Sequence, residues 1–222
     1  MSILEAIDLK KYYGEESSLV KALDGVSLKV EKGEFLSIIG TSGSGKSTLL
    51  NMLGGLDTPT SGKVIVAQND ISTLSDEELT IFRRRNVGFV FQNYNLVPML
   101  NLYENIVLPL ELDGETIDKD YIEEIIELLH LGEKKRRLPN YLSGGEQQRG
   151  AIARALATKP SIILADEPTG NLDSKTSSEV LGLLKKTGEL FNQTIVIITH
   201  NNEIAQLADR IIRIEDGKIF NR

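Results

Sequence analysis

A glycine-rich run near the start of the chain has the residue types and spacing of a phosphate-binding loop. The run GTSGSGKST (Gly40–Thr48) follows the apolar segment FLSII and precedes a predicted helix over Thr48–Leu56. Its glycines let successive backbone N–H groups converge on an oxyanion, and the helix N-terminus adds a positive dipole. A flexible Gly/Ser loop is the alternative, but the strand before the run and the helix after it favour a nucleotide site.

The side chains of this loop have distinct expected roles. Lys46 is expected to reach the β- and γ-phosphates, Ser47 to ligate Mg²⁺, and Thr48 to contact the α-phosphate. The residues expected to bind the nucleotide here are Gly40, Ser42, Gly43, Ser44, Gly45, Lys46, Ser47 and Thr48.

A pair of acidic residues, Asp166 and Glu167, ends a second apolar segment with the sequence SIILA. Ligands of an open parallel sheet bind beyond the carboxyl ends of its strands, so both acids are expected beside the phosphate loop. Asp166 suits Mg²⁺, directly or through water, and Glu167 suits the base that orients and deprotonates the attacking water. An acidic pair after a strand is otherwise typical of a turn, and the phosphate loop favours the functional interpretation.

The elements that must position these groups are short, nearly continuous apolar runs, which are typical of parallel strands buried on both faces. They are Phe35–Ile39, Val87–Phe91, Ile162–Ala165, Ile195–Ile198 and Ile211–Ile214. The N-terminal stretches are half-polar and predict a small antiparallel sheet, with strands at Ile3–Tyr13, Val20–Val30 and Lys63–Ala67 and turn points at Gly25, Gly33 and Gly62.

Two further helices are predicted from their ends. One begins with the capping box Ser75–Glu78 and finishes in Arg83–Arg85, cations placed at the negative end of the helix dipole. A nucleic-acid patch is the alternative interpretation of these arginines. The other helix covers about Asp118–Leu131, with Gly132 as its stop signal and His130 as an ordinary helix-end residue.

The composition argues against several classes of protein and of site. The 222 residues carry 25 Lys+Arg against 32 Asp+Glu, a net charge of −7, and this acidity argues against a nucleic-acid binder. There is no cysteine, and the only histidines are His130 and His200, so thiolate chemistry and an imidazole metal site are not expected. No apolar run approaches eighteen residues or forms a signal core, which predicts a cytoplasmic protein.

The run LSGGEQQR (Leu142–Arg149) resembles the signature motif of the ATP-binding cassette (ABC) ATPases, and the resemblance spans essentially the whole chain. It implies an α/β P-loop NTPase, with a RecA-like parallel core, an N-terminal antiparallel β subdomain and an inserted helical subdomain. The chain then forms a single ABC ATPase domain over 1–222. Residues 1–92 and 158–222 form the core with the antiparallel part, and about 93–157 form the helical subdomain.

The resemblance also implies roles for individual residues. It assigns catalysis to Glu167, His200, Gln92 and Lys46, the metal to Ser47, Gln92 and Asp166, and further nucleotide contacts to Tyr13, Gln92, Ser143, Gly144, Gly145, Glu146, Asp173 and His200. Tyr12 is the alternative to Tyr13 for stacking on adenine. The alternative for Ser143 and its glycines is an ordinary helix cap, and for His200 a strand-end residue satisfied locally.

The ligands and partners follow from the same resemblance. ATP and Mg²⁺ are expected, with two ATP molecules held in a head-to-tail homodimer in which each signature motif faces the other subunit's phosphate loop. Transmembrane permease subunits on separate chains are expected to hold the protein at the inner face of the membrane as a peripheral subunit, and no nucleic acid is expected. Apolar residues after Gln92 either dock the permease or pack the helical lobe, namely Leu96, Val97, Met99, Leu100 and Leu102.

The runs Gly88–Gln92, Asn95-Leu96, Glu104–Leu110 and Ala165–Thr176 resemble those of the LolD/MacB/FtsE-type group, and the resemblance is closest to the antimicrobial-peptide (bacitracin-type) resistance branch. The implied function is to power export or release of a peptide antibiotic, lipoprotein or drug. The alternatives are an FtsE-like cell-division signalling ATPase and an ABC ATPase acting on nucleic acid or ribosomes. Two departures from the family pattern are Asn201, where Asp is frequent, and Gly150, where a β-branched residue is common.

Overall fold

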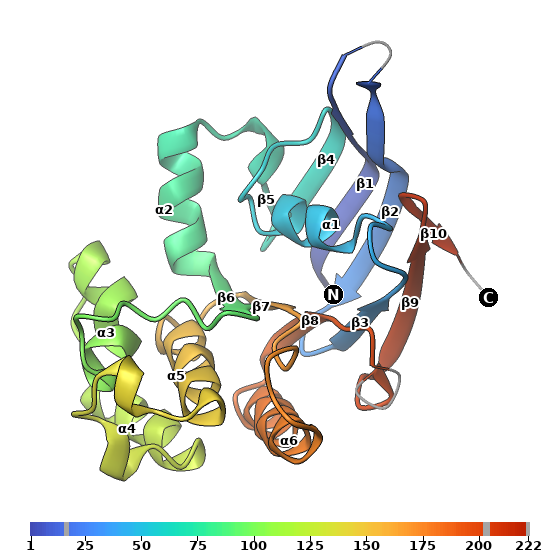
Figure 1. Ribbon diagram of the computed structural model, residues 1–222. Coiled ribbons are helices and arrows are strands. Elements are labelled where there is room, and N and C mark those ends of the chain that lie inside the picture. The colour runs from blue at the N-terminus through green and yellow to red at the C-terminus, as the bar shows by residue number, and fades with distance from the viewer. Residues whose placement is uncertain (16–17, 202–204, 221–222) are drawn as a thin grey trace.

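The computed structural model describes residues 1–15, 18–201 and 205–220, and Figure 1 shows its arrangement. Five parallel strands of this described part form the main sheet in the order β9-β3-β8-β7-β6, and β10 pairs antiparallel with β9 at one edge. Their bounds are β3 Phe35–Ile39, β6 Val87–Phe91, β7 Ile162–Asp166, β8 Thr194–Ile198, β9 Arg210–Glu215 and β10 Lys218–Phe220. The predicted parallel core is confirmed, whereas the short strand β10 was not predicted.

A second, antiparallel sheet has the order β2-β1-β4-β5. Its strands are β1 Ser2–Tyr13, β2 Val20–Glu31, β4 Ser61–Val66 and β5 Asn69–Asp70. Gly33 lies in a turn as predicted, but Gly25 and Gly62 lie inside β2 and β4. Both glycines flank a bulge at Asp8 of β1, where a Cβ on Gly62 would lie 2.4 Å from the Asp8 carbonyl oxygen. Gly62 is required by this close backbone approach, and Gly25 by its left-handed backbone with φ +87°.

Six α-helices within the described residues surround the two sheets. They are α1 Lys46–Leu53, α2 Asp76–Asn86, α3 Leu102–Asp113, α4 Lys119–Leu128, α5 Gly144–Ala157 and α6 Ser174–Leu190, with short 3-10 turns at Ile71–Thr73, Gly132–Lys134 and Pro139–Tyr141. In Figure 1, α3, α4 and α5 form a helical lobe at one end of the molecule, and α1 lies between the two sheets. None of the helices within the described ranges is long and apolar enough to cross a membrane.

Two predicted helix boundaries are wrong. The helix after the phosphate loop begins at Lys46 and ends at Leu53, where Gly54 caps it, so it starts earlier and stops sooner than Thr48–Leu56. Helix α4 ends at Leu128 and not at Leu131, because His130 adopts the left-handed conformation that terminates the helix and Gly132 opens a 3-10 turn. His130 is therefore a helix-end residue as predicted.

The parallel sheet separates two apolar cores. Side chains from alternate positions of β7 and β8 face opposite sides: Leu164 and Val196 pack with α1 and the antiparallel sheet, whereas Ile163 and Ile197 pack with the helical lobe and α6. This alternation follows from the two-residue period of a strand. The phosphate loop therefore joins a strand and a helix that are fixed on several sides by packing.

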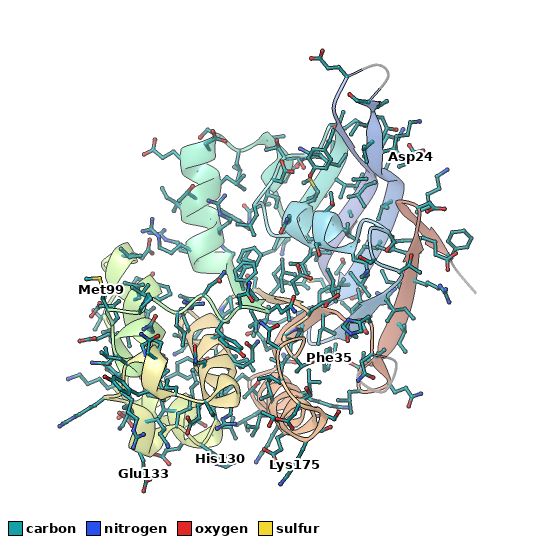
Figure 2. All side chains as sticks on the ribbon, viewed as in Figure 1. Asp24, Phe35, Met99, His130, Glu133 and Lys175 are labelled. Carbon is teal, nitrogen blue, oxygen red and sulfur yellow. The ribbon has the colours of Figure 1, made fainter. Side chains whose placement is uncertain are left out.

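The helical lobe is inserted in the chain between β6 and β7, which pair directly in the sheet, and residues 93–142 contain no strand, as predicted. Some of the apolar residues after Gln92 pack the core of the lobe, and others are exposed. Leu102 is fully buried and Leu96 packs against the core of the lobe, whereas Met99 is 87% exposed and Val97 is 37% exposed. Figure 2 shows the Met99 side chain at the outer edge of the lobe.

The arginines at the end of α2 have partners within the fold. The capping box at Ser75 is formed as predicted. Arg84 and Arg85 bind the carboxylate of Asp113, at the end of α3, with N–O distances of 3.0 and 2.7 Å. The Arg85 guanidinium holds the pKa of Asp113 below its usual range. The helix-end interpretation of these two arginines is supported, because they tie α2 to the lobe.

Gly150 provides a test of the packing between α3 and α5. A Cβ at Gly150 would lie 2.5 Å from Leu102 Cδ1, so this departure from the family pattern permits close contact between the helices. We expect Gly150→Val to reduce the free energy of unfolding by about 1–3 kcal/mol through overpacking. Gly182 is the matched control: it lies inside α6 with open space around it, and Gly182→Ala should stabilise by roughly 0.5–1 kcal/mol. Urea denaturation of both variants measures the difference, and a neutral Gly150→Val would contradict the close packing.

Candidate nucleotide site

The phosphate loop connects β3 to α1 and is held in a conformation that glycine allows. Gly45, the residue before α1, has a left-handed backbone with φ +102°, and a Cβ there would lie 2.3 Å from the Ala22 carbonyl oxygen. No other residue fits without displacing β2. The first N–H groups of a helix lack intrahelical acceptors, so the start of α1 presents donors to an anion.

Lys46 extends back over this loop. Its side chain is almost completely buried, and its ammonium donates to the carbonyl oxygens of Gly40 and Thr41 at 3.0 and 2.7 Å. These neutral acceptors hold the positive charge at the loop without compensating it. A phosphate bound by the loop therefore meets a cation that is already in place.

Ser47 and Asp166 come together from opposite ends of the sequence, as predicted. The Ser47 hydroxyl donates to Asp166 Oδ1 at 3.3 Å. Burial raises the pKa of Asp166, the neighbouring charge of Glu167 raises it less, and the Ser47 hydrogen bond opposes them. A hydroxyl and a carboxylate are oxygen ligands that suit Mg²⁺. No cluster of three or more acidic, His or Cys ligands occurs in the described residues.

Glu167 and His200 form the next pair. The Glu167 backbone has φ +44°, a strained conformation for a non-glycine residue, and its N–H donates to the Ile198 carbonyl of β8 at 3.0 Å. Its carboxylate lies 3.2 Å from His200 Nδ1, with the Glu167 side chain 29% exposed. The strained turn thus directs a partly solvated carboxylate away from β7 and toward the residue that follows β8.

Gln92, at the end of β6, faces the same region. It lines a cavity of about 380 Å³ together with Ser47, Asp166 and Glu167. Its amide donates to Asn171 Oδ1 at 3.1 Å, and Asn171 Nδ2 donates back to the Gln92 carbonyl at 3.1 Å. The structure therefore brings Gln92 to the predicted metal residues and adds Asn171 as the residue that orients it.

A second cavity, of about 390 Å³, adjoins the phosphate loop, and part of its wall was not predicted. Beside loop residues and Glu167 it is lined by Val20, Lys21, Ala22, Asp216 and Gly217. The Gly217 N–H donates to the Ser44 carbonyl at 3.0 Å, so the turn between β9 and β10 supports the loop. The Asp216-Gly217 dipeptide, a frequent hairpin turn, is the signal in the sequence that could have identified this element.

Tyr13 and Tyr12 point to different surroundings. The Tyr13 side chain is 43% exposed, and its hydroxyl donates to Asp57 Oδ2 at 2.8 Å. Its pKa is raised by burial and by Asp57, while a hydrogen bond with Thr48 lowers it, which places the ring beside the end of the phosphate loop. The Tyr12 hydroxyl instead donates to Asp24 at 2.5 Å. This geometry favours Tyr13 as the aromatic nearest to a nucleotide.

Alanine at each tyrosine tests this choice. Base–aromatic stacking contributes about 1–3 kcal/mol, so Tyr13→Ala should raise the KM for ATP by roughly tenfold with little change in kcat. Tyr12→Ala removes a ring of the same size from the same strand and should leave the KM within about twofold. Steady-state ATPase assays measure both, and the reverse pattern would identify Tyr12 as the base contact.

The predicted signature residues lie at a different place. Ser143 caps α5 in a capping box with Glu146, and Glu146 pairs with Lys134 at 2.9 Å. Asp173 caps α6 through the N–H groups of Lys175 and Thr176. The two cavities beside the phosphate loop contain none of the four signature residues Ser143–Glu146. The start of α5 therefore lies outside both cavities beside this chain's phosphate loop.

Known proteins match this chain over most of its length. The family described as ABC transporter matches residues 23–170. The bacitracin export ATP-binding protein BceA of Halalkalibacterium halodurans is 42% identical and covers 100% of this chain and 88% of that protein. The lipoprotein-releasing system ATP-binding protein LolD of Acinetobacter baylyi is 43% identical, covering 97% and 96%. Among solved structures, the chain is similar to the dimeric ATP-binding cassette MJ0796 of Methanocaldococcus jannaschii, in a post-hydrolysis state bound to ADP and phosphate. The two structures have a TM-score of 0.88 and 43% sequence identity, and the match covers 98% of this chain and 97% of that chain.

Proposed function

The chain belongs to the ABC transporter family of ATPases, and from this we propose that it hydrolyses ATP to drive a membrane export or release system whose permease is a separate polypeptide. The observation that carries the proposal is the convergence of Lys46, Ser47, Asp166, Glu167 and His200 from three strand ends beside one loop. Convergence of a phosphate cradle, a metal pair and a base on one point is what phosphoryl transfer to water requires.

The chain's own groups account for the chemistry. Lys46 and the loop N–H groups hold the β- and γ-phosphates, and Ser47 and Asp166 would hold Mg²⁺. The metal would neutralise developing charge on the phosphate oxygens. Glu167 accepts a proton from water as the water oxygen bonds to the γ-phosphorus and the bond to the β–γ bridging oxygen breaks. His200 orients Glu167, and Gln92 links this centre to the helical lobe.

We infer that the site is completed by a second copy. The start of α5 offers a hydroxyl at Ser143 and helix N–H groups at Gly144 and Gly145, outside the cavities beside this chain's own phosphate loop. The related cassette MJ0796 has a dimeric structure. Two ATP molecules are then held between two chains, each nucleotide touched by the phosphate loop of one and by α5 of the other. Residues 93–157 act in this scheme as the helical subdomain.

The cargo class rests on the relatives. BceA is described as a bacitracin export protein and LolD as part of a lipoprotein-releasing system. The cargo is accordingly a peptide antibiotic or a lipoprotein, and the protein works at the inner face of the membrane, attached through its permease.

The test is to purify the protein with its permease from native membranes and to reconstitute the complex in vesicles. Bacitracin and a purified lipoprotein are the two cargo probes. The proposal expects one of them to increase ATP hydrolysis severalfold. Recovery of the protein only with ribosomes or nucleic acid, or ATP hydrolysis that neither cargo changes, would contradict it.

A further inference from the structure

A cavity of about 590 Å³ lies at the edge of the parallel sheet where the strands begin. Ser161, just before β7, and Gln193, just before β8, both line it, whereas the phosphate loop follows the end of β3. The cavity shares no lining residue with the two cavities beside the phosphate loop. Its volume is in the range of pockets that hold small molecules.

One wall of this cavity is aromatic. The rings of Tyr121 and Phe191 meet edge to face, with centroids 5.3 Å apart and planes at 74°. The Tyr121 ring is held in place, because its hydroxyl donates to the Leu156 carbonyl at 3.1 Å and the Lys159 ammonium lies 4.3 Å from its centroid. Leu190, which is 57% exposed, adds aliphatic surface. An apolar side chain of a ligand fits this wall.

A buried amide in the cavity has only one of its two polar atoms bonded. Gln193 is 8% exposed, and its Nε2 donates to the Pro160 carbonyl at 2.8 Å, which fixes the orientation of the amide. Its Oε1 accepts no hydrogen bond from the residues that the structure describes, although an amide oxygen can accept two. An N–H group of a ligand would satisfy this oxygen.

Two opposite charges line the cavity without a partner. Lys32, in the turn between β2 and β3, and Glu124 of α4 are both exposed. Neither forms an ion pair with any residue in the described part of the chain. Lys159, by contrast, is already paired with Asp118 at 2.9 Å. The cavity therefore offers one cation and one anion to a ligand, beside an uncharged acceptor and an apolar wall.

We propose that this cavity binds a free α-amino acid with a large apolar or aromatic side chain. Its carboxylate pairs with Lys32, and its ammonium donates to Glu124 and to the Gln193 amide oxygen. Its side chain packs against Tyr121 and Phe191. An amino acid carries these three groups on one carbon atom, whereas a simple carboxylate or amine leaves one of the two charges unpaired. Since Tyr121 and Glu124 belong to the helical lobe and the other groups to the core, the ligand contacts both.

The first experiment compares three probes that share a phenyl ring, by isothermal titration calorimetry of the purified full-length chain. L-Phenylalanine should bind with a Kd of about 1 mM or below. The probe 3-phenylpropionate lacks the ammonium and 2-phenylethylamine lacks the carboxylate, so each should bind at least about fivefold more weakly, which is modest because both charges are solvated. No binding of L-phenylalanine, or equal binding of either truncated probe, overturns the proposal.

The second experiment assigns each charge to its residue. Lys32→Gln should weaken L-phenylalanine binding at least about fivefold and leave 2-phenylethylamine, which has no carboxylate, unchanged. Glu124→Gln should weaken L-phenylalanine equally and leave 3-phenylpropionate unchanged. Lys175→Gln and Glu77→Gln make the same changes at exposed positions outside the cavity and should bind all probes as wild type does. Wild-type affinity for L-phenylalanine in Lys32→Gln or Glu124→Gln overturns the assignment.

Thermal unfolding separates loss of binding from loss of folding. All four variants lie at exposed positions and should keep the wild-type Tm, and L-phenylalanine should raise the Tm of the wild-type chain but raise it less in Lys32→Gln and Glu124→Gln. ATP hydrolysis should stay at the wild-type rate in all four, because none of these residues lines the cavities beside the phosphate loop. An amino-acid site that fails these tests therefore leaves the proposed ATPase function standing.

Discussion

Glu167→Gln should reduce ATP turnover by about 10²–10⁴-fold while leaving ATP binding intact. The amide keeps the size of the side chain and its position after the strained turn at φ +44°, but it cannot accept a proton from the attacking water. Its hydrogen bond with His200, now 3.2 Å from the carboxylate, can persist. The variant therefore separates ATP binding from the chemical step of hydrolysis.

In the proposed shared site, ATP holds the two chains together until it is hydrolysed, so the same variant should accumulate as a dimer containing two ATP molecules. Single-turnover measurement of phosphate release gives the rate, and light scattering with ATP should give twice the monomer mass of 24.5 kDa. Glu179→Gln, an exposed residue of α6, is the matched control and should behave as wild type. Wild-type turnover in Glu167→Gln would show that another group is the general base.

Lys46→Ala is expected to weaken ATP binding, the step that precedes hydrolysis. The Lys46 ammonium lies over the phosphate loop, held by two carbonyl oxygens at 3.0 and 2.7 Å. Charge-assisted hydrogen bonds contribute about 1.5–3 kcal/mol each, so ATP affinity should fall by about 10- to 100-fold or more. The ATP-dependent dimer should disappear with it.

Equilibrium binding of a fluorescent ATP analogue measures this loss, and the free energy of unfolding should be recorded in parallel because Lys46 is buried. Lys186→Ala on the exposed side of α6 is the control. Unchanged affinity in a folded Lys46→Ala protein would place the phosphates elsewhere. The two variants together distinguish a protein that binds without turnover from one that does not bind.

Much of this site was predictable because its signals are local. Apolar runs identify β3 and β7 nearly residue by residue, and the polar residues that follow them must meet at the carboxyl edge of the sheet. The capping box at Ser75 fixes the start of α2 in the same way. Each of these signals depends on neighbours within a few residues.

What was missed depends on contacts between distant segments. Gly150 is explained by Leu102 on another helix, and Gly25 and Gly62 by a bulge in β1. The support that Gly217 gives to the phosphate loop requires β10, a strand too short for a periodic pattern. Local propensities do not reveal these contacts, because the contacts depend on how distant segments pack.

The sequence also does not show which charged or polar residues pair with each other, because the partners are far apart in the chain. The three consecutive arginines of α2 look alike in the sequence, yet two bind Asp113 and Arg83 binds only neutral acceptors. In the same way, the hydrogen bonds of Gln92 to Asn171 join residues 79 positions apart. Only the folded structure shows which of these polar groups pair with each other.

In the proposed dimer, each ATP is held by the phosphate loop of one chain and by Ser143 of another. The most direct test of this arrangement is the mass and bound ATP of Glu167→Gln compared with the double variant Glu167→Gln/Ser143→Arg. Ser75→Arg in the same background controls for the loss of a serine cap, because Ser75 forms the same capping box at α2. We predict that Ser143→Arg gives a monomer that still binds ATP, whereas Ser75→Arg leaves the dimer. A dimer that persists with Ser143→Arg, or a monomer that has lost ATP, would contradict the shared site.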